Sequence, residues 1–218
     1  MPELPEVETI RRGLELGLTS QIISGVEVLW RNSFPVPHDL IEQIVKGATV
    51  RHLGRRAKVL LLELDNGYSL MFHLKMTGQI VLEKADGERF AGGHPTKSMR
   101  SQLPDSSTKV IFELASGDRL FFNDFRKFGW IKLVPTVEIE IDSLIRRLGP
   151  EPLSSGFTLQ VFRASLLRHA RASIKPTILD QSTIAGIGNI YADESLHLAR
   201  LHPVWRYRDY RRRIALSQ

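Results

Sequence analysis

The chain has 218 residues, of which 42% are hydrophobic and 25% charged, so it can bury one generous core or two modest ones. It contains no cysteine, which excludes disulfides, thiolate nucleophiles and cysteine-ligated zinc. A formal net charge of +6 favours an anionic partner such as a phosphate backbone, although a basic protein without one is as common. No apolar run approaches the roughly 20 residues of a membrane helix, and the acidic N-terminus is unlike a signal peptide. The sequence therefore predicts a cytoplasmic protein with no membrane partner and no metal site.

The first half of the chain predicts one helix followed by antiparallel strands. Apolar side chains recur at helical spacing at Val7, Ile10, Leu14 and Leu18, after a proline that suits a first helical turn. Strand-like runs follow, and Asp65-Asn66-Gly67 is typical of a hairpin turn between two of them. The expected strands are 23–30, 49–53, 58–64, 68–74, 79–82, 109–114, 120–123 and 130–134.

The remaining segments suggest a long excursion and then a helical half. Residues 83–107 are polar and rich in Gly, Lys and Ser, which predicts a surface excursion. Residues 148–156 are rich in Gly, Pro and Ser, and beyond them the apolar period changes from two to about 3.6. The basic and aromatic stretch 205–213 could touch nucleic acid but is as typical of a solvated helix face. Helices are expected at 159–170, around 176–181 and at 189–198.

The N-terminus offers an unusual nucleophile. The nitrogen of Pro2 is an amide while Met1 is attached, but removal of Met1 turns it into a secondary amine that can form an iminium. An α-amino group has a pKa of about 7.7–8.0, so a useful fraction is nucleophilic at neutral pH. Glu3 could act as a general acid, and Glu6 could orient the site from the first helical turn. Taken alone, this Pro-Glu pair is better explained as the start of a helix.

Short motifs stand in order along most of the chain. They are Pro2-Glu3-Leu4-Pro5-Glu6-Val7-Glu8-Thr9, Phe72-His73-Leu74-Lys75-Met76-Thr77-Gly78, Asp124-Phe125-Arg126-Lys127-Phe128-Gly129, Leu148-Gly149-Pro150-Glu151-Pro152-Leu153, and the trio Ile174-Lys175-Pro176, Asp180-Gln181 and Ala185-Gly186-Ile187-Gly188-Asn189-Ile190-Tyr191-Ala192. In this order they resemble the formamidopyrimidine-DNA glycosylases, whereas any one motif would be weak evidence. The resemblance covers about the first 200 residues.

The resemblance implies an α+β fold, in which an N-terminal antiparallel β-sandwich domain with flanking helices precedes a C-terminal helical helix-two-turn-helix domain. Domain boundaries are expected at residues 1–135 for the catalytic sandwich domain, 136–156 for the linker and 157–218 for the DNA-binding domain. The implied partner is damaged double-stranded DNA, bound by a monomer in the bacterial cytoplasm at the nucleoid.

The implied activity is that of a bifunctional DNA glycosylase and AP lyase of base excision repair. It would excise oxidised purines, namely 8-oxoguanine and formamidopyrimidines, and nick the strand through a Schiff base at Pro2. Glu3 would protonate the sugar ring oxygen, and Lys58 would contact the phosphates beside the lesion. Without the family, Lys58 is better explained as an exposed strand lysine.

Further residues are implied to contact DNA. Met76, Arg126 and Phe128 would fill the void left by an everted nucleotide, since eversion costs a few kcal/mol and the gap must be occupied. From the pattern alone, Met76 and Phe128 fit core positions equally well, and Arg126 fits an ordinary surface charge. Lys175 and Asn189 are the expected phosphate contacts. His73 could add another, although a strand histidine is more often structural.

The chain also departs from the family pattern. Bacterial members usually bind one zinc ion through a C-terminal four-Cys finger, and with no cysteine the cofactor expectation is none. Phe125 stands where the family often has Pro, and Lys127 where it often has Arg. Two alternative functions stay open at this point: a non-catalytic or truncated homologue that binds damaged DNA, and an endonuclease VIII-like enzyme for oxidised pyrimidines.

Overall fold

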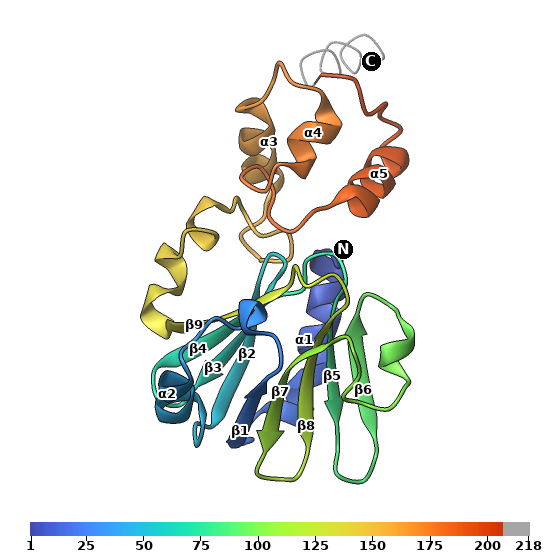
Figure 1. Cartoon of the computed structure of the whole chain (residues 1–218). Helices are drawn as coiled ribbons and strands as arrows, with labels where there is room; N and C mark the ends of the chain where they lie inside the picture. Colours follow the sequence, from blue (N-terminus) through green and yellow to red (C-terminus); the bar gives the residue numbers. More distant parts are fainter. Residues whose placement is uncertain (207–218) are drawn as a thin grey trace. The chain divides into compact units, whose positions relative to one another are not determined.

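The computed structural model describes residues 1–206, and the chain divides into two compact units, Met1–Glu140 and Ile141–Gln218. Each unit has its own apolar core. The first unit contains the expected sheet structure and the second contains the expected helices (Figure 1). Among the described residues, no helix combines the length and the apolar character that crossing a membrane would require.

The first unit opens with helix α1 (Leu4–Leu18), as the apolar spacing predicts. Glu3 is the N-cap and forms a capping box with Glu6, which satisfies backbone N–H groups that have no partner within the first turn. The helix buries one stripe, which consists of Leu4, Val7, Ile10, Leu14 and Leu18.

Two antiparallel sheets form the body of this unit (Figure 1). One sheet has five strands in the order β1-β7-β8-β5-β6, and the other has four in the order β2-β3-β4-β9. The strands are β1 (Ile23–Val28), β2 (Val50–Arg56), β3 (Val59–Leu64), β4 (Tyr68–His73), β5 (Gly78–Glu83), β6 (Arg89–Gly93), β7 (Thr108–Leu114), β8 (Arg119–Asp124) and β9 (Trp130–Pro135). The predicted hairpin turn joins β3 to β4, where Gly67 has a φ of 83°.

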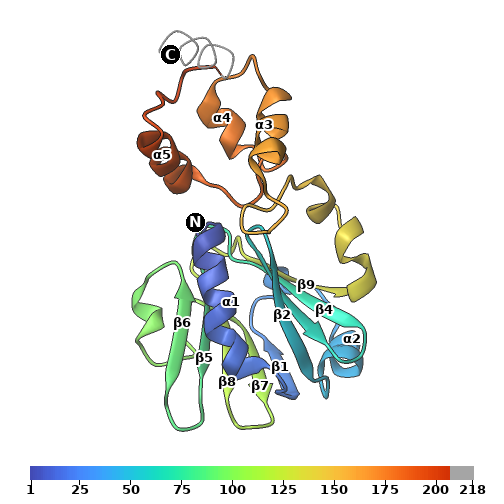
Figure 2. The same ribbon diagram turned by 180° about the vertical axis from the view of Figure 1, so that it is seen from behind.

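The core lies between the two sheets and is closed along one side by α1. Side chains of both sheets meet in one cluster, in which Phe72 of β4 packs against Phe112 of β7 and Phe122 of β8. Helix α1 packs against β2 and β6, the outer strands of the two sheets, and Figure 2 shows it running along the domain between them. The close approach favours glycine, since a Cβ on Gly13 would overlap the ring of Phe90. The predicted β-sandwich is confirmed.

The expectation of a strandless excursion at residues 83–107 is wrong in part. The segment contains β6, which pairs with β5 along its full length. None of the five β6 residues is fully buried, which explains why its polar, glycine-rich sequence gave no strand signal. Beyond β6 the chain crosses the outer face of the five-stranded sheet and places Leu103 against Val81, Ile111 and Phe121. A short helix α2 (His38–Leu40), continued by a π-helical turn at Ile41–Val45, was also not expected.

The second unit contains three helices within its described residues, namely α3 (Leu159–Leu167), α4 (Ile174–Leu179) and α5 (Asn189–Leu198). Their core includes Leu166, Ile178, Ala192 and Leu196. Helix α3 ends three residues before the predicted position, whereas the bounds of α5 agree with the sequence prediction. Residues of the stretch 207–213 lie outside the part of the chain that the structure describes.

Candidate active site

Strand register brings three connections of the sandwich to one end. They are the β2–β3 turn at residues 57–58, the β4–β5 connection at 74–77 and the β8–β9 loop at 125–129, which we call the wedge loop. The register pairs that fix this arrangement are Arg56–Val59, Val59–His73, His73–Trp130 and Gly78–Asp124. Residues that are far apart in the sequence therefore meet at one edge of the sheets.

The start of α1 holds the predicted nucleophile and acid. Pro2 and Glu3 are both buried, and Glu3 is only 3% exposed. The backbone N–H of Glu3 donates a 2.7 Å hydrogen bond to Oε2 of Glu6, within the capping box. Glu6 thus fixes the backbone immediately after Pro2, as its predicted supporting role requires.

Lys58 lies close to these carboxylates, although the two segments are more than 50 residues apart. Lys58 is 7% exposed, so the interpretation as an exposed strand lysine is wrong. Burial lowers the pKa of its ammonium group below the usual value, while the negative charges of Glu3 and Glu6 oppose that shift. The structure therefore brings Pro2, Glu3, Glu6 and Lys58 to one region of the first unit.

A chain of hydrogen bonds connects the Lys58 turn to α1. Ala57 has a φ of 52°, in the left-handed region that residues with a Cβ seldom adopt. Its carbonyl oxygen accepts a 2.9 Å bond from Nη1 of Arg55, whose Nε lies 3.0 Å from Oε2 of Glu8 on α1. Burial works to raise the pKa of Glu8, but hydrogen bonds from its arginine partners outweigh it and lower the pKa to about 2. Glu8 is therefore a permanent anion at neutral pH.

His73 ends β4 beside Lys58 and is 8% exposed. Its Nδ1 accepts a 3.0 Å hydrogen bond from the backbone N–H of Lys75, and its ring lies 5.4 Å from that of Trp130. Burial, followed by the positive charges of Lys75 and Lys58, lowers the pKa of His73 to about 3. A neutral imidazole that accepts at Nδ1 carries its proton on Nε2, so any contact with a phosphate would be as a neutral donor.

Asp124 joins the wedge loop to the neighbouring connection. Its carboxylate is fully buried and accepts hydrogen bonds from the hydroxyl of Thr77 and from the backbone N–H groups of Arg126 and Gly129, the last two at 3.2 and 2.6 Å. Gly129 is required here, since a Cβ would lie 2.8 Å from the ring of Phe122. One buried carboxylate therefore shapes both loops that carry the predicted void-filling residues.

The three residues predicted to fill the void are surface residues of these loops. Met76 is 41% exposed and Phe128 54% exposed, so their interpretation as core residues is wrong. The guanidinium carbon of Arg126 lies 4.9 Å from the centre of the Phe128 ring, a cation–π arrangement. These side chains project from a rigid base that Asp124 holds in place.

Lys175 and Asn189 belong to the second unit. Asn189 is exposed and is the first residue of α5, directly after the N-cap Gly188. Lys175 of α4 forms an ion pair with Asp193 of α5, with a shortest N···O distance of 2.6 Å. The predicted phosphate contacts therefore lie on adjacent helices, and Lys175 already has a carboxylate partner in the protein.

Gln181 shapes the turn that precedes α5. Its amide nitrogen donates to the carbonyl oxygens of Leu179 and Ile187 at 2.9 and 2.7 Å, and its amide oxygen accepts from Gly186 N–H at 2.9 Å. Gly186 has a φ of 87°, which favours glycine. The segment Gly149–Pro150 is also tied to this region, because Gly149 N–H donates to the Gln181 carbonyl and the Pro150 carbonyl accepts from Ala185.

Sequence reasoning gave no role to Asp124, Gln181 or the Arg55–Glu8 pair. Asp124 and Gln181 stand inside the motifs quoted above, each five residues before a glycine, Gly129 or Gly186, whose backbone N–H donates to its side chain. A polar residue at this distance from a motif glycine could have indicated a loop held by a side chain. The Arg55–Glu8 pair joins residues 47 positions apart, and a single sequence gives no sign of it.

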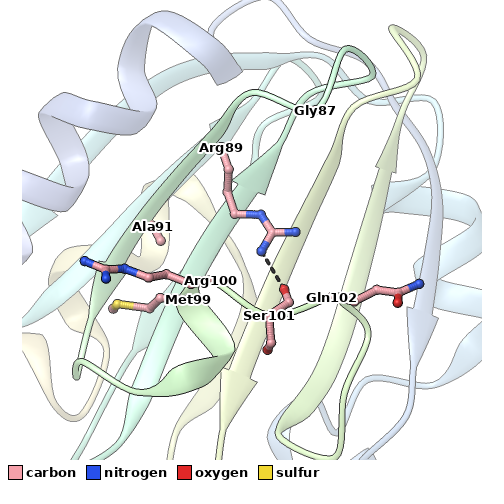
Figure 3. Close-up of a pocket in the computed structure, with 7 residues that line it drawn as sticks. All are labelled: Gly87, Arg89, Ala91, Met99, Arg100, Ser101 and Gln102. Carbon is pink, nitrogen blue, oxygen red and sulfur yellow. Dashed lines mark hydrogen bonds between the residues drawn. The ribbon is translucent and has the colours of Figure 1, made fainter.

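A surface hollow elsewhere in the first unit contains none of the predicted site residues. A hollow of about 640 Å³ is lined by residues of β6 and of the segments on either side of it. Arg89 donates a 2.6 Å hydrogen bond to the carbonyl oxygen of Ser101 there, as drawn in Figure 3. Residues 1–206 contain no group of three or more His, Asp or Glu side chains that could hold a metal ion. The chain has no cysteine, so its residues do not fit a four-Cys zinc finger.

Comparisons with known proteins identify both parts of the chain. A family model described as the formamidopyrimidine-DNA glycosylase N-terminal domain matches residues 1–131, and one described as the H2TH domain of the same glycosylase matches residues 148–209. The formamidopyrimidine-DNA glycosylase of Pelotomaculum thermopropionicum is 44% identical over 205 residues, which are 93% of this chain and 68% of that protein. That of Rhodopseudomonas palustris is 43% identical over 208 residues, again 93% and 68%.

Solved structures give the same result. Lactococcus lactis Fpg in complex with DNA containing N7-benzyl-Fapy-dG superposes with a TM-score of 0.79 at 32% identity, covering 94% of this chain and 70% of that one. The complex of the same protein with DNA containing an abasic site has the same TM-score and identity, covering 94% and 69%.

A β-sandwich unit followed by a helix-two-turn-helix unit defines a DNA-binding protein of DNA repair. The predicted fold class and family resemblance are both confirmed. The chain belongs to the formamidopyrimidine-DNA glycosylase family.

Proposed function

We propose that this protein is a bifunctional glycosylase and AP lyase that removes oxidised purines from duplex DNA and nicks the strand through a Schiff base at Pro2. The observation that carries the proposal is the buried cluster at the start of α1, in which Pro2 is buried next to Glu3, and Glu3 lies within electrostatic reach of Lys58. Membership of the glycosylase family supports the base-excision step.

The chemistry follows from the cluster. Once Met1 is removed, the secondary amine of Pro2 attacks the anomeric carbon, the bond to the damaged base breaks, and the base leaves with a proton. Glu3 protonates the ring oxygen as the sugar opens, which leaves an iminium between Pro2 and the open-chain sugar. The iminium acidifies the adjacent carbon, so the phosphates on both sides can be eliminated in turn.

The neighbouring groups support this sequence of steps. Lys58 offers a buried ammonium group that would bind a phosphate beside the lesion, and phosphate charge would further stabilise its protonated form. Met76, Arg126 and Phe128 are exposed on adjoining loops, as residues that replace an everted base must be. Lys175 and Asn189 provide a second set of contacts to the DNA backbone.

The substrate class rests on the relatives. Their name specifies formamidopyrimidine-DNA, and the Lactococcus lactis structures contain Fapy-dG derivatives or abasic sites. We therefore assign oxidised purines as substrates ahead of oxidised pyrimidines. The partner is damaged double-stranded DNA, and the working form is a monomer in the bacterial cytoplasm.

The test is borohydride trapping of Met1-processed protein on two duplexes, one with 8-oxoguanine and one with an abasic site. We expect a cross-link at Pro2 with both, located by peptide mass analysis. Glu3→Gln should slow base excision by about 10²–10⁴-fold, the range usual for loss of a general acid. A chain extended at its N-terminus, in which the Pro2 nitrogen stays an amide, is the matched control and should give no cross-link.

Each other result has a defined meaning. A cross-link with the abasic duplex alone would remove oxidised purines from the proposal, and a duplex with an oxidised pyrimidine would then be tried. Lesion-selective binding without any cross-link, from folded and processed protein, would replace the enzyme with a non-catalytic binder of damaged DNA.

A further inference from the structure

One side chain of the wedge loop contacts the sandwich domain through an aromatic ring. Lys127 stands between Arg126 and Phe128, and its Nζ lies 3.8 Å from the centre of the Trp30 ring. This is the shortest cation–π distance among the described residues, and the Arg126 contact with Phe128 is longer at 4.9 Å. Trp30 precedes the wedge loop by almost 100 residues, so the contact connects two distant segments of the chain.

The backbone at Trp30 is held by hydrogen bonds to strand β7. The backbone N–H groups of Leu29 and Trp30 both donate to the carbonyl oxygen of Lys109, at 2.9 and 3.1 Å. Lys109 belongs to β7, which pairs with β1 and with β8, the strand that leads into the wedge loop. The backbone that carries the Trp30 ring is therefore tied to the same sheet as the strand that leads into the wedge loop.

The backbone of Lys127 has an unusual conformation. Its φ is 61°, in the left-handed region, where a residue with a Cβ is uncommon without a compensating interaction. Lys127 and its neighbours Arg126 and Phe128 are all exposed, and Lys127 extends over the ring of Trp30 while Arg126 lies over the ring of Phe128. Backbone and ring contact are thus two independent observations of one arrangement.

The charged groups near Lys127 do not provide it with an ion-pair partner within the described residues. Lys109 is a buried cation in this region, and burial followed by the positive charge of the exposed Lys127 lowers the pKa of Lys109. The carboxylate of Asp124 is engaged with Thr77, Arg126 and Gly129. Within residues 1–206, no carboxylate lies in ion-pair distance of Lys127, and the Trp30 ring is its attractive contact.

We propose that Lys127 and Trp30 form an anchor that holds the wedge loop in the conformation from which Arg126 and Phe128 enter the DNA stack. The inference rests on the proposed function of the same site. Lys127 and Trp30 are positioning residues, since they act through Arg126 and Phe128. Their contribution should appear only where the stacked duplex must be opened, because that step is the one in which the wedge is used.

The test compares two DNAs that contain the same stable abasic analogue, one in a fully paired duplex and one in an unpaired internal loop. Trp30→Leu and Lys127→Met should each weaken binding to the paired duplex by about 3–20-fold, the range expected from a cation–π contact. Binding to the unpaired site should change less than about twofold. The double variant should be no weaker than either single variant, because both remove one interaction.

Two further variants provide controls. Lys127→Arg keeps a cation over the ring and should restore binding to the paired duplex. Lys84→Met removes one positive charge from an exposed pair with Glu88 and should leave both affinities unchanged.

The competing role for Lys127 is a direct phosphate contact, and it gives a different pattern. Lys127→Met would then weaken both DNAs and lower the salt dependence of binding by about one unit, while Trp30→Leu would have no effect. That pattern would overturn the anchor. If the parent protein binds neither DNA, the proposed function fails. The anchor can still be tested by urea unfolding of the two single variants and the double variant. Additive losses in the free energy of unfolding would refute the anchor.

Discussion

At the scale of single residues, the surroundings decide what each group can do. Pro2, Glu3 and Lys58 are ordinary residue types, but all three are buried at one end of the sandwich, where the carboxyl group of Glu3 acts on the ammonium group of Lys58. His73 illustrates the same point, since its burial beside Lys75 and Lys58 keeps the imidazole neutral. The motif that contains His73 could be recognised from the sequence, but its protonation state could not.

The neutral His73 predicts a pH dependence of stability. Its folded pKa of about 3 lies below the ordinary value of 6.5, so between these values the unfolded chain binds a proton that the folded protein does not. This contribution to stability is fully present above pH 6.5 and is lost progressively as the pH falls towards 3. His73→Asn keeps an acceptor for the Lys75 N–H but does not titrate in this range.

Urea unfolding at pH 7.5 and pH 4.5 measures the effect. The free energy of unfolding of the parent should fall by about 2–3 kcal/mol more than that of His73→Asn over this interval. Equal losses in the two proteins would mean that His73 protonates without penalty in the folded state.

At the scale of elements, loops are shaped by buried polar groups. Asp124 sits at the end of β8 and accepts three hydrogen bonds, which no pattern of apolar residues can reveal. The strands and α1 were predictable because each buries a face with a period of two or 3.6. Strand β6 was not, since its side chains are only partly buried and its sequence is polar.

The role of Asp124 predicts a selective loss. Asp124→Asn has the same size but replaces one acceptor oxygen by a donor, so at least one bond to Thr77, Arg126 or Gly129 must be lost in a buried site. Stability should fall by about 2–3 kcal/mol, measured by urea unfolding. Affinity for a paired abasic duplex should fall as well, because the wedge loop loses its support.

A matched substitution tests whether the effect belongs to this site. Asp86→Asn changes an exposed turn residue between β5 and β6 and should leave stability within about 0.5 kcal/mol of the parent. If the two variants lost the same free energy of unfolding, the hydrogen bonds of the buried Asp124 would contribute no more to stability than those of an exposed carboxylate.

At the scale of the whole molecule, the chain consists of two units with separate cores. The proposed chemistry belongs to Met1–Glu140, and the proposed phosphate contacts Lys175 and Asn189 belong to Ile141–Gln218. A unit with its own core is expected to fold by itself. DNA binding should nevertheless require both, since each contributes part of the contact to the backbone.

A fragment of residues 1–140 tests this division. It should unfold cooperatively in urea, and it should bind an abasic duplex at least about tenfold more weakly than the full chain, because it lacks the phosphate contacts of the second unit. Unchanged affinity would remove Lys175 and Asn189 from the interface. A fragment without a cooperative transition would show that the first core depends on the second unit.

The sequence by itself determined the family and most of the order of the elements, and it predicted the residues proposed to carry the chemistry, because motif spacing and apolar period are local properties of the chain. It could not determine which of those residues are buried, which loops share one carboxylate, or that Lys127 would lie over Trp30. These depend on strand register and on contacts between segments separated by many residues. Burial and electrostatics, and therefore protonation and loop shape, are decided only when the sheets close around the core.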